Sequence, residues 1–298
     1  MSTPSRLTLG GVALFMLGIF LLACTDTITK YLAALYPALL VVAMRYVGQL
    51  VLMLLMAPAH GRSMLQTRRT GLVLFRATCL AAASLTLTLA LQRMPVAETS
   101  AIVFLFPILV ILLAGTVLRE HIDPTGWLAA IAGFIGVLLI ARPGSGLDAL
   151  GVAFALLSAV FNAVYHLLSR VLARTEQTMA LMFYTGLVGT VCFGLTLPWY
   201  WPEYLPPLTH LALFCCTGLL AGTGHLLLTA AHRHSPASAL APMLYVHLIW
   251  AALFGWLVFS HVPDGFGILG MLIIAAAGAL VALKSRLASR SMLQAAKG

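Results

Sequence analysis

Apolar runs of about 20 residues recur along nearly the whole chain, and a helix of this length crosses the hydrocarbon core of a bilayer. We recognise ten such runs, at about residues 8–31, 38–57, 71–91, 96–118, 124–141, 149–172, 178–197, 208–231, 237–258 and 265–284. Only 8% of the 298 residues are charged, whereas a soluble domain carries about 25%. The chain therefore has too few charges to cover a water-facing surface, and the sequence predicts a membrane protein.

The runs lack the alternation of polar and apolar residues that is typical of outer-membrane β-barrel strands. Lipid permits only helices or closed barrels across its core. We therefore expect an all-α integral membrane protein with ten transmembrane helices.

The net charge of +9 indicates an orientation in the membrane rather than binding to nucleic acid. With a cytoplasmic N-terminus, only Lys30, Arg93 and Arg142 fall at outer ends of the spans, and Arg45 and Arg76 fall within helices. The other Lys and Arg residues lie at or near cytoplasmic ends, as the positive-inside rule requires. We expect a multi-pass protein of a bacterial inner membrane, embedded in the lipid bilayer with both termini cytoplasmic.

The second half of the chain repeats the pattern of the first. An offset of 140 residues aligns GVALFMLGIFLLACTDTITKYLA (11–33) with GVAFALLSAVFNAVYHLLSRVLA (151–173), and an offset of 141 aligns Pro95 with Pro236. This near-constant offset predicts two units, residues 1–147 and 148–298, each with five spans. Five is an odd number, so the second unit must enter the membrane from the opposite side. Such inverted repeats are a transporter architecture with the substrate site at the repeat interface.

The segment PVAETSAIVFLFPILVILLAGTVLREHI (95–122) resembles the fourth span of the drug/metabolite transporter superfamily, EamA type. In that family the span runs from a Pro-hydrophobic-Ala start to a Gly-Glu end, which here corresponds to Pro95, Ala97 and Glu120. Two positions depart from the pattern: Arg119 replaces the usual glycine, and His261 stands where the family often keeps an acid.

The resemblance implies export of amino acids and other small metabolites, and the aromatic amino acid exporter branch is the nearest that it suggests. Alternatives remain open at this stage. The same architecture permits uptake, and an intramembrane enzyme could use Glu98, His166 and His225.

Polar residues inside the spans are the candidates for contact with a substrate, because a charge at the centre of a membrane helix costs about 2.5–3.5 kcal/mol. Asp26 and Lys30 are four residues apart on one helix face, and Asn162 and His166 repeat this spacing in the aligned helix. Lys30 alternatively reaches the headgroups with its long side chain. The predicted substrate-binding residues are Asp26, Arg45, Ser84, Glu98, Asn162, His166, His225 and Tyr245.

Each of the remaining candidates also has a structural alternative. His225 lies on a face of small residues that leaves room around it, but a buried histidine also bonds to carbonyls. Glu98 near a helix start is also a favourable partner of the helix dipole. Arg45 suits a substrate carboxylate, although pairing with Asp26 is the simpler interpretation. Tyr245 would suit an apolar cargo, and it points to a different face from His247.

Nothing in the sequence indicates an enzyme: it has no HExxH motif, phosphate-binding loop or Ser/His/Asp set in a convincing context. The five cysteines lie inside predicted helices and have no metal-site spacing. We therefore expect no catalytic residue, metal or cofactor. Without a nucleotide-binding segment, transport would depend on an ion or solute gradient, and protons acting through His166 or His225 are one candidate.

Overall fold

The computed structural model describes residues 9–117, 124–142, 146–172, 175–203, 205–234 and 240–295. Every regular element within these ranges is a helix, as the apolar runs predict. The elements are α1 (Leu9–Ala33), α2 (Ala38–His60), η1 (Gly61–Met64), α3 (Thr70–Arg93), α4 (Val96–Val103), α5 (Phe106–Val117), α6 (Pro124–Ile140), α7 (Ala149–Leu172), α8 (Thr178–Gly194), α9 (Leu197–Tyr200), α10 (Leu208–His234), η2 (Ala241–Tyr245), α12 (Val246–Phe259) and α13 (Gly265–Ala295).

Six of the described segments are long and apolar enough to cross a membrane: Leu9–Ala33, Ala38–Met56, Thr70–Arg93, Val96–Leu113, Ala149–Leu172 and Leu208–Ala231. Four shorter apolar helices, Pro124–Ile140, Thr178–Gly194, Met243–Phe259 and Gly265–Leu280, lie over the other runs in the sequence. The helical membrane fold is therefore clear, whereas the count of ten spans stays a prediction.

Two of the expected spans are not continuous α-helices. The run 96–118 is interrupted between α4 and α5 at Phe104 and Leu105. Pro107 is the second residue of α5, and proline has no N–H to continue a helix through this point. The run 237–258 includes a short 3₁₀ segment, η2, before α12 begins at Val246.

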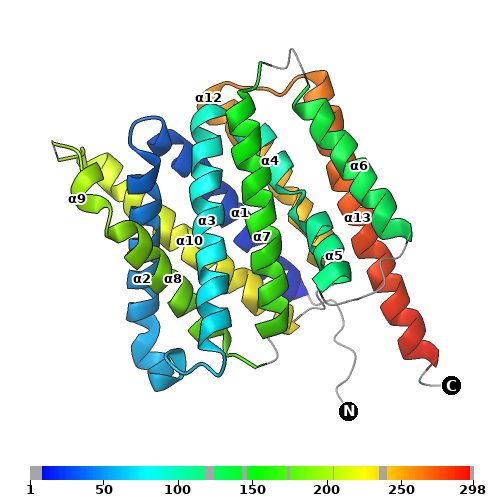
Figure 1. Ribbon diagram of the computed structural model, residues 1–298, viewed down its shortest axis with the longest axis horizontal. Coiled ribbons are helices and arrows are strands. Elements are labelled where there is room, and N and C mark those ends of the chain that lie inside the picture. The colour runs from blue at the N-terminus through cyan, green and yellow to red at the C-terminus, as the bar shows by residue number, and fades with distance from the viewer. Residues whose placement is uncertain are drawn as a thin grey trace.

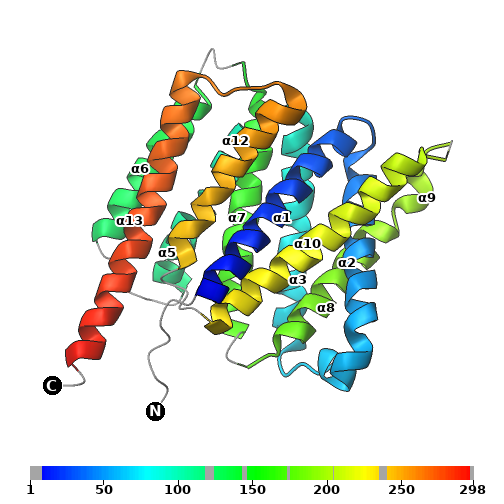
Figure 2. The same ribbon diagram turned by 180° about the vertical axis from the view of Figure 1, so that it is seen from behind.

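The closest helix pairs join the two halves of the chain. α1 packs on α10, α3 on α7, α2 on α8 and on α10, and α6 on α13. Figure 1 shows α3 and α7 side by side, and Figure 2, from behind, shows α1 and α10 side by side. α6 and α13 form one edge of the bundle in both views, and α1 begins at the same end at which α13 ends.

Small residues permit these close pairings. A Cβ atom built on Gly18 of α1 would lie 3.0 Å from the carbonyl oxygen of Gly224 of α10. A Cβ on Gly218 of α10 would lie 2.6 Å from the carbonyl oxygen of Arg45 of α2. Close approach of backbones through glycine is typical of membrane helices, where dispersion contacts replace the hydrophobic effect.

Large apolar side chains cover the outside of the bundle. On α6 the exposed positions Trp127, Ile131, Phe134 and Leu138 recur every three or four residues, so they form one face. A continuous exposed apolar face is unfavourable in water. It fits a helix whose outer face contacts lipid.

Candidate functional site

The two interrupted helices meet inside the bundle. The ring of Phe104, at the end of α4, lies 4.9 Å from the ring of His247 in α12 and 6.0 Å from that of Tyr245 in η2, centroid to centroid. An offset of 141 residues aligns Phe104 with Tyr245, so the interruptions occupy corresponding places in the two halves. Interrupted membrane helices of this kind form the substrate sites of many transporters.

An acidic residue of α1 lies beside this meeting point. Nε2 of His247 is 3.2 Å from Oδ2 of Asp26, without the geometry of a hydrogen bond, so the contact is an ion pair when the histidine is protonated. The side chains are 5% and 16% exposed. The contact joins the first half of the chain to the second at a titratable pair.

Neither basic residue expected near Asp26 is its described partner. Lys30 donates through Nζ to the carbonyl oxygens of Leu91 and Met94, at 2.7 Å each. These carbonyls lie at the C-terminal end of α3, where a cation is favoured by the helix dipole. Nη1 of Arg45 lies 3.4 Å from the hydroxyl of Ser84. The predicted pairing of Asp26 with Lys30 or Arg45 is therefore replaced by a pairing with His247.

Several buried polar atoms around α1, α4, η2 and α12 have no hydrogen-bond partner among the described residues. They include Oγ1 of Thr29, Oγ of Ser100, the hydroxyl of Tyr245 and Nε1 of Trp250. These elements contact one another, since α12 packs on α1, α4 and η2. Buried polar groups are nearly always hydrogen-bonded in proteins, so this region has unused capacity to bind a polar molecule or water.

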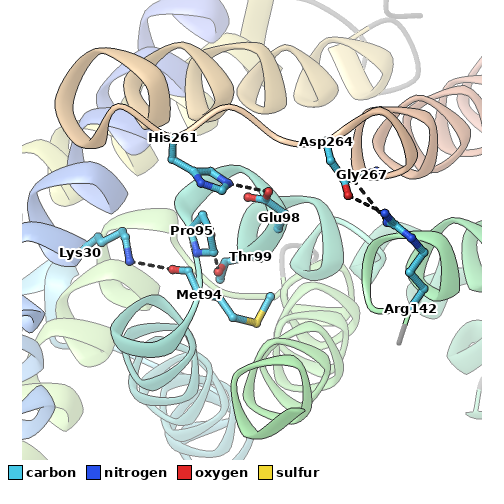
Figure 3. A network of polar contacts seen from close by, with 9 residues as sticks. All are labelled: Lys30, Met94, Pro95, Glu98, Thr99, Arg142, His261, Asp264 and Gly267. Atoms are coloured by element: carbon cyan, nitrogen blue, oxygen red, sulfur yellow. Dashed lines mark hydrogen bonds and ion pairs between the residues drawn. The ribbon is translucent and has the colours of Figure 1, made fainter. Parts of the chain in front are cut away.

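A second group of polar contacts lies at the end of the bundle where α4 and α13 begin (Figure 3). Nε2 of His261 lies 2.8 Å from Oε1 of Glu98, a residue that is 5% exposed. Next to this pair, Nη2 of Arg142 donates to Oδ2 of Asp264 at 2.5 Å, and Oδ1 of Asp264 accepts from the N–H of Gly267 at 2.7 Å. Both pairs join the first half of the chain to the second.

The aspartates at this end of the bundle are held in their charged form. The hydrogen bond from Arg142 and the bond from the N–H of Gly267 lower the pKa of Asp264 below its ordinary value. Asp148 has the same arrangement: Nη1 of Arg93 donates to it at 2.9 Å, and this bond and the N–H of Leu150 lower its pKa. A cavity of about 230 Å³ beside these contacts is lined by Lys30, Gln92, Arg93, Met94, Pro95, Val96, Gly255, Phe259 and His261.

The other predicted site residues are distributed between two regions. Ser84 is buried and bonds to Tyr46 at 2.9 Å. Asn162 donates to the carbonyl oxygen of Ser158 in its own helix, at 3.0 Å. His166 is exposed and stacks on Phe106 at 4.6 Å, and His225 is partly exposed.

Tyr245 and Glu98 therefore lie with the interrupted helices, as does Asp26. His166 of α7 also contacts them, through its ring on Phe106 at the start of α5. The other predicted residues belong to α2, α3, α7 and α10: Arg45, Ser84, Asn162 and His225. Sequence reasoning did not select Phe104 or His247 for the site. The signal available was the offset of 141, which places Phe104 over Tyr245.

The similarities to known proteins extend over most of the chain. The model of the EamA-like transporter family matches residues 9–142 and 149–283. The pseudopaline exporter CntI of Pseudomonas aeruginosa is 29% identical over 271 residues, which cover 90% of this chain and 94% of that protein. The S-adenosylmethionine uptake transporter of Rickettsia bellii is 25% identical over 264 residues, with coverage of 89% and 90%.

A riboflavin transporter of Brucella anthropi is 27% identical over 235 residues, which cover 76% of this chain and 82% of that protein. A crystal structure of another protein has a similar fold, with a TM-score of 0.66 at 20% identity, covering 95% of this chain and 99% of that one. These relatives are named as carriers of pseudopaline, S-adenosylmethionine and riboflavin. The suggested placement in the aromatic amino acid exporter branch is therefore not supported.

Proposed function

The chain belongs to the EamA-like transporter family, and from this premise we propose that it is a secondary transporter that exports small organic metabolites, amino acids among them, across a bacterial inner membrane. Its relatives are named transporters, which favours transport over the intramembrane enzyme. The relatives include an exporter and uptake proteins. Export is our choice because the pseudopaline exporter is 29% identical to this chain, whereas the S-adenosylmethionine uptake transporter of Rickettsia bellii is 25% identical.

One observation carries the mechanism: the interrupted helices of the two halves meet at Phe104, Tyr245 and His247, beside Asp26. Interruption frees backbone groups from helical bonding, and those groups can then coordinate a solute within the membrane. We place the transport route through this meeting point, between the two inverted units 1–147 and 148–298. Movement of one unit against the other exposes the cargo to each side in turn.

The exposed position of His166 supports a route toward one side of the membrane. The exposed apolar positions of α7 include Leu157 and Val160, and His166 lies about 120° around the helix from Val160, at 100° per residue. His166 thus faces away from that apolar surface. We retain His166 and His225 as the proposed groups for proton coupling.

The test is transport by purified protein in proteoliposomes, with a panel of radiolabelled amino acids loaded inside or outside. We expect gradient-driven flux of at least one amino acid, recovered chemically unchanged. Recovery of a chemically altered product, or flux no faster than in empty liposomes for every member of the panel, would contradict the proposal.

Flux in both directions under reversed gradients is expected of any secondary carrier, so direction needs a separate measurement. Cells that lack the protein should accumulate the cargo if it exports, and should fail to take it up from the medium if it imports. Accumulation in the knockout supports export, and loss of uptake supports the alternative.

A further inference from the structure

Two arginines lie inside the helix bundle, on neighbouring helices. Arg45 of α2 is 8% exposed, and Arg76 of α3 is 6% exposed. A guanidinium group keeps its charge in a protein, and a buried charge is unfavourable without an opposite charge and full hydrogen bonding. Both guanidinium groups therefore require a carboxylate or another anion nearby.

No carboxylate in the described part of the chain pairs with either arginine. The chain has eight Asp and Glu residues, of which Glu120 and Asp123 lie outside the described residues. The others are engaged elsewhere or exposed: Asp26 with His247, Glu98 with His261, Asp148 with Arg93, Asp264 with Arg142, Glu176 with the N–H groups of Arg68 and Arg69, and Glu203 in an exposed loop.

Neutral groups satisfy most of the hydrogen-bonding capacity of Arg76. Its donors reach the hydroxyls of Ser169 at 2.7 Å, Tyr165 at 2.8 Å and Thr185 at 3.1 Å, and the carbonyl oxygen of Leu181 at 3.3 Å. Its guanidinium also lies 4.3 Å from the centroid of the Tyr165 ring. Arg76 thus joins α3 to α7 and α8, and its position is fixed without any ligand.

Arg45 has no such set of partners. Its one described hydrogen bond, to Ser84, is long at 3.4 Å, and its buried Nε has no partner among the described residues. The hydroxyl of Ser84 is in turn 2.9 Å from that of Tyr46. The planar guanidinium group of Arg45, with hydrogen-bond donors that have no described partner, therefore lies beside the hydroxyls of Ser84 and Tyr46.

Arg45 and Arg76 both face the region of the bundle around His225. Arg45, Arg76 and His166 all lie within electrostatic range of His225 on α10. The backbones of α2 and α10 are in contact at this level, where a Cβ on Gly218 would lie 2.6 Å from the carbonyl oxygen of Arg45. The two arginines thus act on the same region of the bundle.

We propose that Arg45 binds an oxyanion of the cargo, a carboxylate or a phosphate group, with the hydroxyl of Ser84 as a second donor. The fork of a guanidinium fits both oxyanions through two parallel hydrogen bonds. This inference rests on the proposed transport function and specifies its cargo as an anion or a zwitterion. Because Arg45 is 8% exposed, the structure shows the binding group in a closed form, and the helices around it must part to admit the cargo.

The test measures binding without transport. Purified protein in detergent is heated in sodium acetate, sodium phosphate or sodium chloride at equal ionic strength, and the midpoint of unfolding is recorded. A ligand that binds only the folded state raises this midpoint. We expect acetate or phosphate to raise it above its value in chloride. Phosphate also stabilises folded proteins by exclusion from their surface, so the anion whose effect depends on Arg45 identifies the cargo group as carboxylate or phosphate.

The variants are Arg45→Met and Arg45→Lys, with Arg142→Gln as control, because Arg142 is an arginine that already has a carboxylate partner. Arg45→Met should weaken the apparent affinity for the effective anion at least tenfold, or about 1.4 kcal/mol. Arg45→Lys keeps the positive charge but loses the planar guanidinium group, so it should weaken the affinity by an intermediate amount. If the Arg45→Met variant does not fold, the Arg45→Lys variant provides the test. Arg142→Gln should keep the full response.

Equal midpoints in all three salts, or an unchanged response in the folded Arg45 variants, would overturn the proposal. The outcome is separable from that of the proposed function. An anion response that depends on Arg45, together with no flux of any amino acid, would reject amino acid transport and retain the oxyanion site. Flux of an amino acid without such an anion response would retain amino acid transport and reject the oxyanion site.

Discussion

Asp26 and His247 form a contact beside the interruption at Phe104, and they come from different halves of the chain. Both side chains are largely buried. A buried charge with one charged partner depends on that partner, because removal of either member leaves the other uncompensated. In the proposed mechanism, the pair links the transport route to the relative position of α1 and α12.

We expect Asp26→Asn and His247→Gln each to reduce proteoliposome flux at least tenfold, or about 1.4 kcal/mol. The physical reason is that each variant leaves an unpaired polar group at the meeting point of the interrupted helices. Flux and the midpoint of thermal unfolding are measured together, with Thr27→Ser as control, because the Thr27 hydroxyl bonds within its own helix at 2.8 Å. Normal flux in either variant would assign that residue a structural role.

The sequence identifies charged residues within the apolar runs, but it does not identify the residues that pair with them. A charge such as Asp26 within an apolar run is visible at once. Its partner was not, because the choice among Lys30, Arg45 and His247 depends on how α1 is rotated against α12. Lys30 is used instead by the carbonyls of Leu91 and Met94 at the end of α3, an arrangement that requires the tertiary structure.

At the level of single helices, the apolar pattern predicted several boundaries closely and missed the interruptions. The run 149–172 coincides with α7, and the run 71–91 lies within α3 (Thr70–Arg93). The run 96–118 is divided at Phe104 and Leu105. The apolar pattern missed this division because the residues on both sides of it are equally hydrophobic. Pro107 was one local signal, and Pro242, the second residue of η2, is a comparable signal in the run 237–258.

The contact of α2 with α10 gives a test of helix packing. Alanine in place of glycine raises helix propensity by about 1 kcal/mol, whereas overpacking costs about 1–3 kcal/mol. Gly218→Ala places its methyl group 2.6 Å from the carbonyl oxygen of Arg45, so we expect a net loss of stability. Gly71→Ala in α3 meets nothing within 4 Å and should be neutral or stabilising.

The measurement is the yield of monodisperse protein in detergent and its midpoint of unfolding. A Gly218→Ala variant at least as stable as Gly71→Ala would show that α2 and α10 can separate without cost. That result would also weaken the placement of Arg45 against α10.

For the molecule as a whole, the helix pairing follows the predicted relation between halves. α1 with α10 and α3 with α7 are equivalent pairs under that relation, and α2–α8 and α6–α13 each pair a helix with its own counterpart. This pattern supports inverted five-helix units, which remain a prediction together with the orientation of the termini.

Cysteine labelling tests the orientation. In a variant without the five native cysteines, a cysteine at Glu203 should react with a membrane-impermeant reagent added to intact spheroplasts. A cysteine at Gln66, in the loop before α3, should react only after permeabilisation, as should one near the C-terminus. Reaction of the C-terminal cysteine from outside would contradict both the ten-span count and the inverted repeat.

The pair formed by Arg142 and Asp264 gives a pH dependence. Because the hydrogen bond from Arg142 lowers the pKa of Asp264 from its ordinary value of 3.8, the pair stabilises the fold above that value. The contribution is lost as the pH falls through the lowered pKa. We expect Asp264→Asn to be less stable than the wild type at pH 7, with the difference shrinking below about pH 4. A difference independent of pH would show that charge at Asp264 is not the cause.

The pairing of helices between halves also has a consequence for biosynthesis. α1 and α3 leave the ribosome before their main neighbours α10 and α7, and at about 5–20 residues per second the second half takes roughly 8–30 s to appear. During that interval Arg76 lacks Tyr165, Ser169 and Thr185, which bind it in the finished protein. The newly inserted first half therefore stays in the membrane with the charge of Arg76 unsatisfied. It should be a favoured target of insertion chaperones and membrane proteases until the second half has been synthesised.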